Sequence, residues 1–365
     1  MQQQTDKIRA IRVPRGMQFV LFATAMAWAA AANTIASRAA LGIATRFQVG
    51  LIESLLDSLF LLFLAVVGFR ALDSIATRGR YAAEALPLPA RAGWPREWGV
   101  GAAIGWGLCL AAALPVLVTG NLHARLSWHA GSTEAVAIAL ATLLVATLAQ
   151  EVIFRGYAFR RLIAAIGPSW AAVLGSVLFA ALTVQANPPH NFLVALVDCT
   201  FFGLLLAMAW FRTHALWLGW GLHFAYRAVA AVVLGLPIAG HGEYGSPTDM
   251  YATGPRWLSG GAFGLDAAVL TALVILAGMI LLYRATRDYA WEYTHPPIVP
   301  AGYEVTVAPP AAHIAMEKSA APPPLVQILP STPQSRSAIG GAAEPSLPPA
   351  TVAAHPSGEP SSVIH

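Results

Sequence analysis

A short polar stretch at the end of an apolar run could do chemistry. Gln150, Glu151 and Arg155 close an apolar run that begins near Ala135. A helix places Glu151 and Arg155, which are four residues apart, on one face. Ionisable groups at membrane depth are costly, so they usually face a bundle interior and pair or take part in a reaction. The pair therefore has two interpretations, a structural ion pair between helices or part of a catalytic site.

Further ionisable side chains lie in other apolar runs. Asp198 lies in one, and His223 and Arg227 lie four residues apart in another. Together with the first pair they are too many for plain packing, and they predict a polar cavity between the helices that carry them. Glu53 and Asp57 lie near the start of an earlier run, where we expect them at the membrane interface.

The composition is that of a membrane protein. Of 365 residues, 57% are hydrophobic and 11% are charged, and the mean hydropathy is +0.60. Soluble proteins carry roughly 25% charged residues. The net charge of +4 comes from dispersed loop residues and indicates no nucleic-acid partner. Cys109 and Cys199 both fall in apolar runs, which predicts buried thiols and no disulfide framework.

Eight apolar runs predict an all-α bundle of about eight transmembrane helices. They span about 17–36, 52–71, 98–118, 135–156, 170–184, 192–211, 216–234 and 262–282. The first run follows four basic residues and could be a signal peptide. It is longer than the usual apolar core of such a peptide, which favours a retained helix.

The loop charges predict which side each loop lies on. With the N-terminus inside, fourteen Lys and Arg residues of the N-terminus and loops fall on the inner side and four on the outer side. The sequence therefore predicts a multi-pass protein of the bacterial cytoplasmic membrane with both termini in the cytoplasm.

The chain divides by composition into four parts. We expect a basic cytoplasmic N-terminus (1–16), three helices with their loops (17–134), a membrane core (135–283) and a tail (284–365). The tail is rich in Pro and Ala and poor in large apolar residues, which predicts disorder. It could dock a partner or be a passive extension.

Three segments resemble one family. Residues 150–156 (Gln-Glu-Val-Ile-Phe-Arg-Gly) resemble the Glu-Glu-x-x-x-Arg motif of the CAAX prenyl endopeptidase and bacteriocin-processing (CPBP, Abi) intramembrane proteases. Residues 179–183 and 223–227 resemble the family's Phe-x-x-x-His and His-x-x-x-Asn/Asp motifs. Segments 187–188, 202–206, 212–217, 235–240 and 260–264 are also similar. The resemblance covers about 135–265 and implies a helical membrane core that acts on prenylated or membrane-embedded peptides.

The motifs are degenerate. The resemblance implies that the family's first Glu, with the second-motif His, activates the attacking water. Gln150 and Thr183 stand at those two positions, and Arg227 stands where the third motif has Asn or Asp. Glu151, Arg155 and His223 keep the pattern.

The substitutions remove the expected base. Amide hydrolysis needs a base to take a proton from water, and neither a Gln amide nor a Thr hydroxyl is one. A divalent metal is poorly supported, because a catalytic metal usually needs about three protein ligands. Glu151 and His223 supply two, and Asp198 would be a third only in a new geometry. We also expect Arg227 to crowd His223 with positive charge and so to favour neutral imidazole.

Three functions remain open. One is a relative with weak, altered or lost peptidase activity that binds a membrane peptide, lipid or partner. Another is an active endopeptidase in which Glu151 or His223 is the base of a rearranged centre. A third is a transporter, which would also explain a polar cavity. The missing base favours the first.

Overall fold

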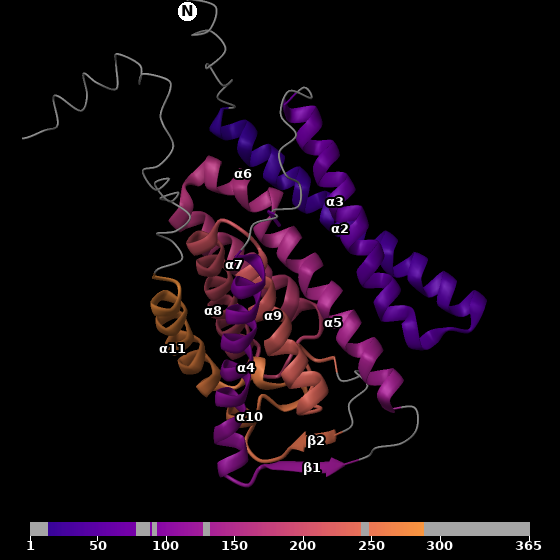
Figure 1. Ribbon diagram of the computed structural model, residues 1–365, viewed down its shortest axis with the longest axis vertical. Coiled ribbons are helices and arrows are strands. Elements are labelled where there is room, and N and C mark those ends of the chain that lie inside the picture. Colours follow the sequence, from indigo (N-terminus) through magenta and orange to yellow (C-terminus); the bar gives the residue numbers. More distant parts are fainter. Residues whose placement is uncertain (1–13, 78–87, 90–92, 127–131, 242–247, 288–365) are drawn as a thin grey trace, which may run out of the picture. The chain divides into compact units, whose positions relative to one another are not determined.

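The computed structural model describes residues 14–77, 88–89, 93–126, 132–241 and 248–287. The predicted basic N-terminus, most of the loop after residue 77 and the Pro-rich tail lie outside these residues. The described chain is a bundle of helices with one small pair of strands (Figure 1), and the prediction of an all-α membrane bundle is confirmed.

Six helical segments of the described chain are long and apolar enough to cross a membrane. They are α2 (Arg15–Phe47), η2 with α3 (Gly50–Ile52 and Glu53–Thr77), α4 (Trp94–Val118), α5 with α6 (Ser132–Arg155 and Tyr157–Ile166), α7 (Pro168–Ala186) and α8 (Phe192–Thr213). The protein is therefore an integral membrane protein.

The predicted count of eight membrane-length helices is not confirmed. In place of the seventh, α9 (Trp217–Ala228) runs into a π-helical turn, η3 (Val229–Val233). In place of the eighth, the chain forms α10 (Arg256–Ser259) and the 3-10 turns η4 (Gly261–Phe263) and η5 (Leu265–Ala267) before α11 (Val269–Ala285). Gly264 adopts a φ of 92°, which interrupts helical geometry. The 17 residues of α11 extend about 25 Å, short of the roughly 30 Å hydrocarbon core.

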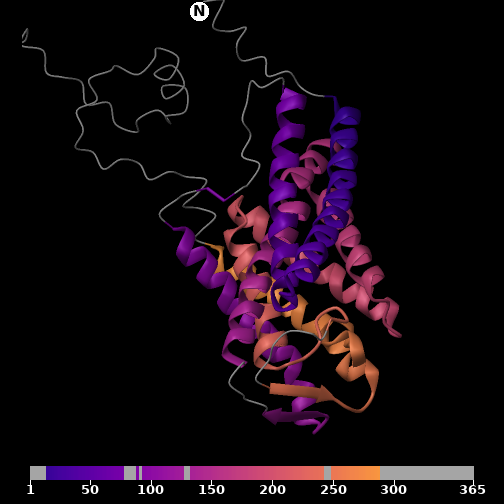
Figure 2. The same ribbon diagram turned by 90° about the vertical axis from the view of Figure 1, so that its right-hand side faces the viewer.

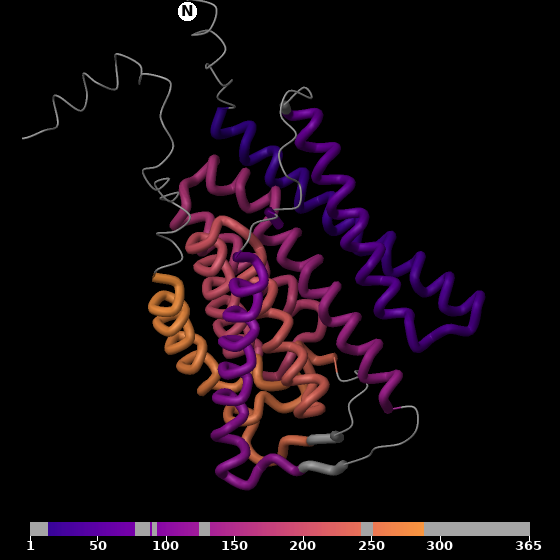
Figure 3. Tube along the Cα trace, viewed as in Figure 1, coloured from indigo at the N-terminus to yellow at the C-terminus, as the bar shows by residue number. Residues whose placement is uncertain are grey.

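The fourth predicted helix is broken at Gly156. A Cβ there would lie 2.2 Å from the carbonyl oxygen of Val152, so only glycine fits. Its ψ of −127° turns the chain out of α5 into the short helix α6 (Figure 3). Arg161 on α6 contacts Asp73 of α3 at 2.5 Å and donates to Gln18 of α2 at 3.2 Å. These contacts of α6 therefore hold α2 and α3 in place.

The helices α2 and α3 form a long hairpin and lie side by side in both views (Figures 1 and 2). Small residues of α2 bury against α3, and Trp28 donates its indole N–H to the carbonyl of Leu64 at 2.9 Å. The hairpin packs on α5 as well as α6, so it forms a wall beside the helix that carries Glu151.

Close backbone contact fixes α9 against α4. A Cβ on Gly101 or Gly105 would lie 2.1 Å from a carbonyl oxygen of α9, and one on Gly221 would lie 2.2 Å from a carbonyl of α4. Small residues allow such approach in membrane bundles. The short α9 is thus enclosed, and its His223 is fully buried.

Two strands, which the sequence analysis did not predict, join distant parts of the chain. β1 (Leu122–Leu126) follows α4, and β2 (Thr248–Ala252) follows η3. They pair antiparallel, with His123 opposite Tyr251. Paired strands satisfy backbone groups that the two connections would otherwise leave open.

Candidate functional site

Glu151, Arg155 and His223 form one buried group, called here the Glu151 cluster. One carboxylate oxygen of Glu151, Oε1, contacts His223 Nδ1 at 2.8 Å and accepts from Arg155 Nη1 at 3.4 Å. The second guanidinium nitrogen of Arg155 donates to the carbonyl of Gly203 on α8 at 3.1 Å. The three side chains are 1%, 2% and 0% exposed. The cluster therefore ties α5 to α8 and α9.

The cluster fixes the tautomer of His223. The carboxylate can only accept, so Nδ1 carries the proton and donates it. Its other nitrogen, Nε2, is buried and has no partner among the described residues. A carboxylate that orients an imidazole in this way is the arrangement of a general base, provided that the free nitrogen reaches a substrate or water.

Phe179 lies between His223 and the nearest cavity. Its ring packs edge-on to the imidazole with centroids 6.1 Å apart, and the Arg155 guanidinium lies over its face at 4.7 Å. Phe179 lines the cavity, whereas Glu151 and His223 do not. The aromatic ring therefore shields the cluster.

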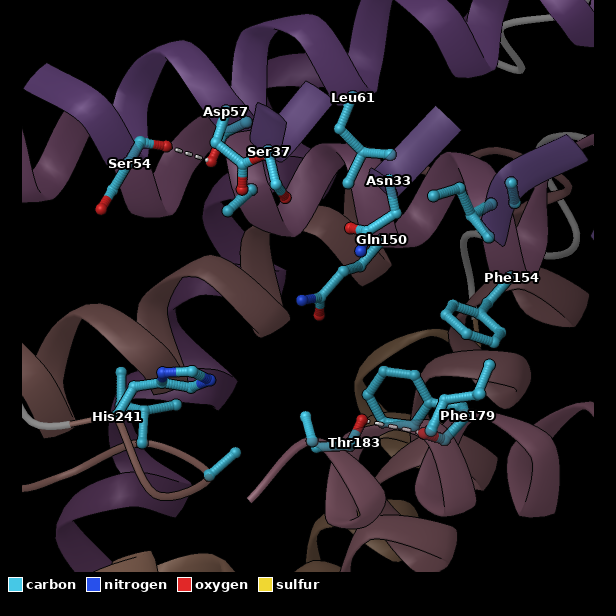
Figure 4. Close-up of a pocket in the computed structure, with 18 of the residues that line it drawn as sticks. Asn33, Ser37, Ser54, Asp57, Leu61, Gln150, Phe154, Phe179, Thr183 and His241 are labelled. Atoms are coloured by element: carbon cyan, nitrogen blue, oxygen red, sulfur yellow. Dashed lines mark hydrogen bonds between the residues drawn. The ribbon is translucent and has the colours of Figure 1, made fainter. Parts of the chain in front are cut away.

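The cavity has a volume of about 790 Å³ and is called here the central cavity. It is lined by residues of α2, α3, α5 and α7, by Arg227 of α9 and by the segment after η3. Gln150 projects into it, and Thr183 and His241 lie across from the hairpin (Figure 4). Two of the substituted motif positions thus face this cavity.

Neither substituted residue supplies a base to the cavity. The Thr183 hydroxyl donates to the carbonyl of Phe179 on its own helix at 2.8 Å, a common arrangement of helical Thr. Gln150 offers an amide, which has no titratable group near neutral pH. The space where water and substrate could meet therefore lacks the base that the resemblance implies there.

Arg227 also lines the cavity, but its charge is balanced. Its Nη1 contacts Asp266 Oδ2 at 2.5 Å. Arg227 therefore has a carboxylate partner in Asp266, and the expectation that it favours neutral imidazole at His223 stays a prediction. Sequence reasoning missed Asp266, which lies in a Gly-rich turn with no helical spacing to link it to Arg227.

Asp198 does not join the Glu151 cluster. It is buried on α8, and neither carboxylate oxygen has a partner among the described residues. The same residues contain no group of three or more His, Cys, Asp or Glu that could hold a metal ion. Glu151 and His223 bind each other, so the donor set remains short of the usual three.

Sequence reasoning also missed the hairpin's part in the cavity. Asp57, expected at the interface, lines the cavity with Asn33 and Ser37. The Ser37 hydroxyl donates to Asp57 Oδ1 at 2.9 Å. On the other wall, Asn187 Nδ2 lies 2.9 Å from His241 Nε2. The four-residue spacing of Glu53 and Asp57 places both on one face of α3, but it does not show what that face contacts.

The sequence of α5 to α9 is similar to that of a known family. Residues 131–229 match the family model of the type II CAAX prenyl endopeptidase Rce1-like proteins. This segment is Rce1-like. The match runs from the start of α5 through the first residue of η3 and contains the Glu151 cluster, Gln150 and Thr183. No curated protein and no solved structure matches the chain.

The match confirms the resemblance seen in the motifs, within narrower bounds. The similar segments at 235–240 and 260–264 lie beyond it, as does the α2–α3 hairpin. The chain is thus a membrane protein that contains a segment, less than half of the sequence, similar to Rce1-like proteins. The wider link to bacteriocin-processing proteins stays a prediction.

Proposed function

We propose that this protein binds membrane-embedded or prenylated peptides and has lost most or all peptidase activity. One observation carries the proposal: Gln150 and Thr183 face the central cavity at the positions where the resemblance implies a base and its His partner. The retained Glu151 and His223 lie behind Phe179. Without a base at these two positions, hydrolysis loses the proton transfer that the resemblance implies there, which contributes about 10²–10⁴-fold.

A cleavage assay tests the proposal. Purified protein in liposomes is incubated with prenylated peptides and with membrane-spanning peptides, and products are identified by mass spectrometry. We expect no products above those of the heat-denatured protein. Robust cleavage that His223→Ala abolishes, with folding retained, would overturn the proposal.

An active enzyme with a rearranged centre is the second candidate. The free Nε2 of His223, with Nδ1 bound to Glu151, favours it. In that case Arg155 orients the carboxylate, and Phe179 must move before His223 reaches a peptide. The cleavage assay distinguishes the two candidates, since only this one requires turnover.

We also propose that both ends of the chain lie in the cytoplasm. The fourteen-to-four division of loop Lys and Arg supports this orientation. With single cysteines introduced into a Cys-free background, an impermeant reagent added outside cells should label Gln48→Cys, in the turn between α2 and α3, and not Ser335→Cys. Labelling at position 335 in intact cells would contradict the orientation.

A further inference from the structure

One carboxylate in the wall of the central cavity has no Lys or Arg partner among the described residues. Asp57, Arg227 and His241 are the titratable side chains in its described wall. Arg227 is paired with Asp266 at 2.5 Å. Asp57 contacts a neutral hydroxyl, that of Ser37, and within the described chain no cation lies in salt-bridge range of it. The wall therefore presents one carboxylate whose charge is not balanced by a Lys or Arg.

Neutral hydrogen-bonding groups surround this carboxylate. Asn33 and Gln150 each carry an amide that both donates and accepts, and Ser54 adds a hydroxyl. Such groups suit the backbone of an extended peptide, whose N–H and C=O groups need partners at membrane depth. Leu61 and Phe154 add apolar surface to the cavity.

We infer that the central cavity binds a membrane-embedded peptide segment through a cationic side chain, Lys or Arg, that pairs with Asp57. The volume of about 790 Å³ falls in the range of ligand sites, roughly 300–1,000 Å³. Asp57 lies within the membrane-length segment Gly50–Ala76. A carboxylate in such a segment is costly unless it is paired, so a cation on the ligand supplies the partner that the wall lacks. This inference rests on the proposed function and deepens it, since it names the group that is recognised.

The charge balance argues against an anionic phospholipid as the occupant. A lipid phosphate needs a cation, and the described Arg of this wall is already neutralised by Asp266. Asp57 would repel the phosphate. Asp57, which selects the cation, belongs to the hairpin, outside the Rce1-like segment, so this chain can differ in specificity from other proteins with that segment.

Photo-crosslinking tests the inference. Model single-span peptides of Leu and Ala carry one Lys beside a photoreactive residue, and matched peptides carry norleucine or Glu in place of Lys. The full chain in liposomes should crosslink the Lys peptide about tenfold more than the norleucine peptide, as for one charge-assisted contact. Asp57→Asn should remove the preference, and Asp57→Lys should shift it to the Glu peptide.

Glu53→Gln is the matched control. It removes a carboxylate one turn earlier on α3, and Glu53 does not line the cavity, so the Lys preference should persist. Thermal unfolding of each variant shows that it is folded, and Asp57→Asn alone decides the matter if Asp57→Lys fails to fold. Equal crosslinking of the Lys and norleucine peptides by the unmodified chain, or a preference that survives Asp57→Asn, would overturn the inference. So would a bound phospholipid that peptides do not displace.

The same samples separate this inference from the proposed function. Cleavage products with the Lys preference intact would contradict the loss of activity and leave recognition by Asp57 standing. If neither cleavage products nor a preference for the Lys peptide is found, the proposed loss of activity stands and recognition by Asp57 is contradicted.

Discussion

The double variant Gln150→Glu/Thr183→His should cleave membrane-embedded peptides about 10²–10⁴ times faster than the unmodified protein. Both side chains face the central cavity, so the double change places a carboxylate and an imidazole beside a bound peptide. The carboxylate can then take a proton from water. Either change alone should do little, because catalytic groups act as a unit and their effects are non-additive.

A control variant shows whether activity depends on the new catalytic pair or only on a change in the shape of the site. Gln150→Glu with Thr183→Val adds a carboxylate and a branched side chain of similar size to Thr, but no imidazole, and it should remain inactive. Arg227 should be left unchanged, because its removal would leave Asp266 without its ion-pair partner. A folded double variant that binds peptide but shows no product in the mass-spectrometric assay would show that more than the missing base prevents turnover.

Removing the Glu151 carboxylate should cost the protein about 3–5 kcal/mol of unfolding free energy. Glu151→Ala leaves the Arg155 guanidinium and the His223 Nδ1–H buried without the oxygen that they share. Arg155 keeps its contact with the Gly203 carbonyl, but a carbonyl dipole does not neutralise a buried charge. The measurement is reversible unfolding in detergent, with denaturant.

Two further variants provide comparisons for this loss of unfolding free energy. Glu151→Gln keeps the shape and one oxygen acceptor, so it should cost less than Glu151→Ala. Glu134→Ala lies in the first turn of the same helix, outside the cluster, and should change stability by less than about 0.5 kcal/mol. A Glu151→Ala protein as stable as the unmodified one would contradict a structural role for the cluster.

Local sequence features were enough to predict the class of the fold and part of the site. Apolar runs predicted the bundle because each helix must bury its backbone hydrogen bonds within itself at membrane depth. The four-residue spacing placed Glu151 and Arg155 on one face, and the structure joins them at 3.4 Å. The motifs revealed the Rce1-like resemblance and the missing base. These features depend on local spacing and on residue type.

Helix number and length depended on the tertiary structure. Two of the eight predicted helices are short, and the fourth breaks at Gly156. Hydropathy alone does not show such breaks, because the residues on both sides of a break are apolar. The glycine contacts of α4 with α9 compensate for the short α9 by enclosing it in protein.

The residues that line the central cavity are brought together by the packing of the helices, which local sequence does not reveal. Phe179 separates His223 from the cavity, Asp266 neutralises Arg227, and Asp57 reaches the cavity from a hairpin far away in the sequence. Each contact joins segments whose relative placement follows from the packing of whole helices. Local spacing fixes the face of a helix on which a side chain lies, and only the assembled bundle fixes what that face meets.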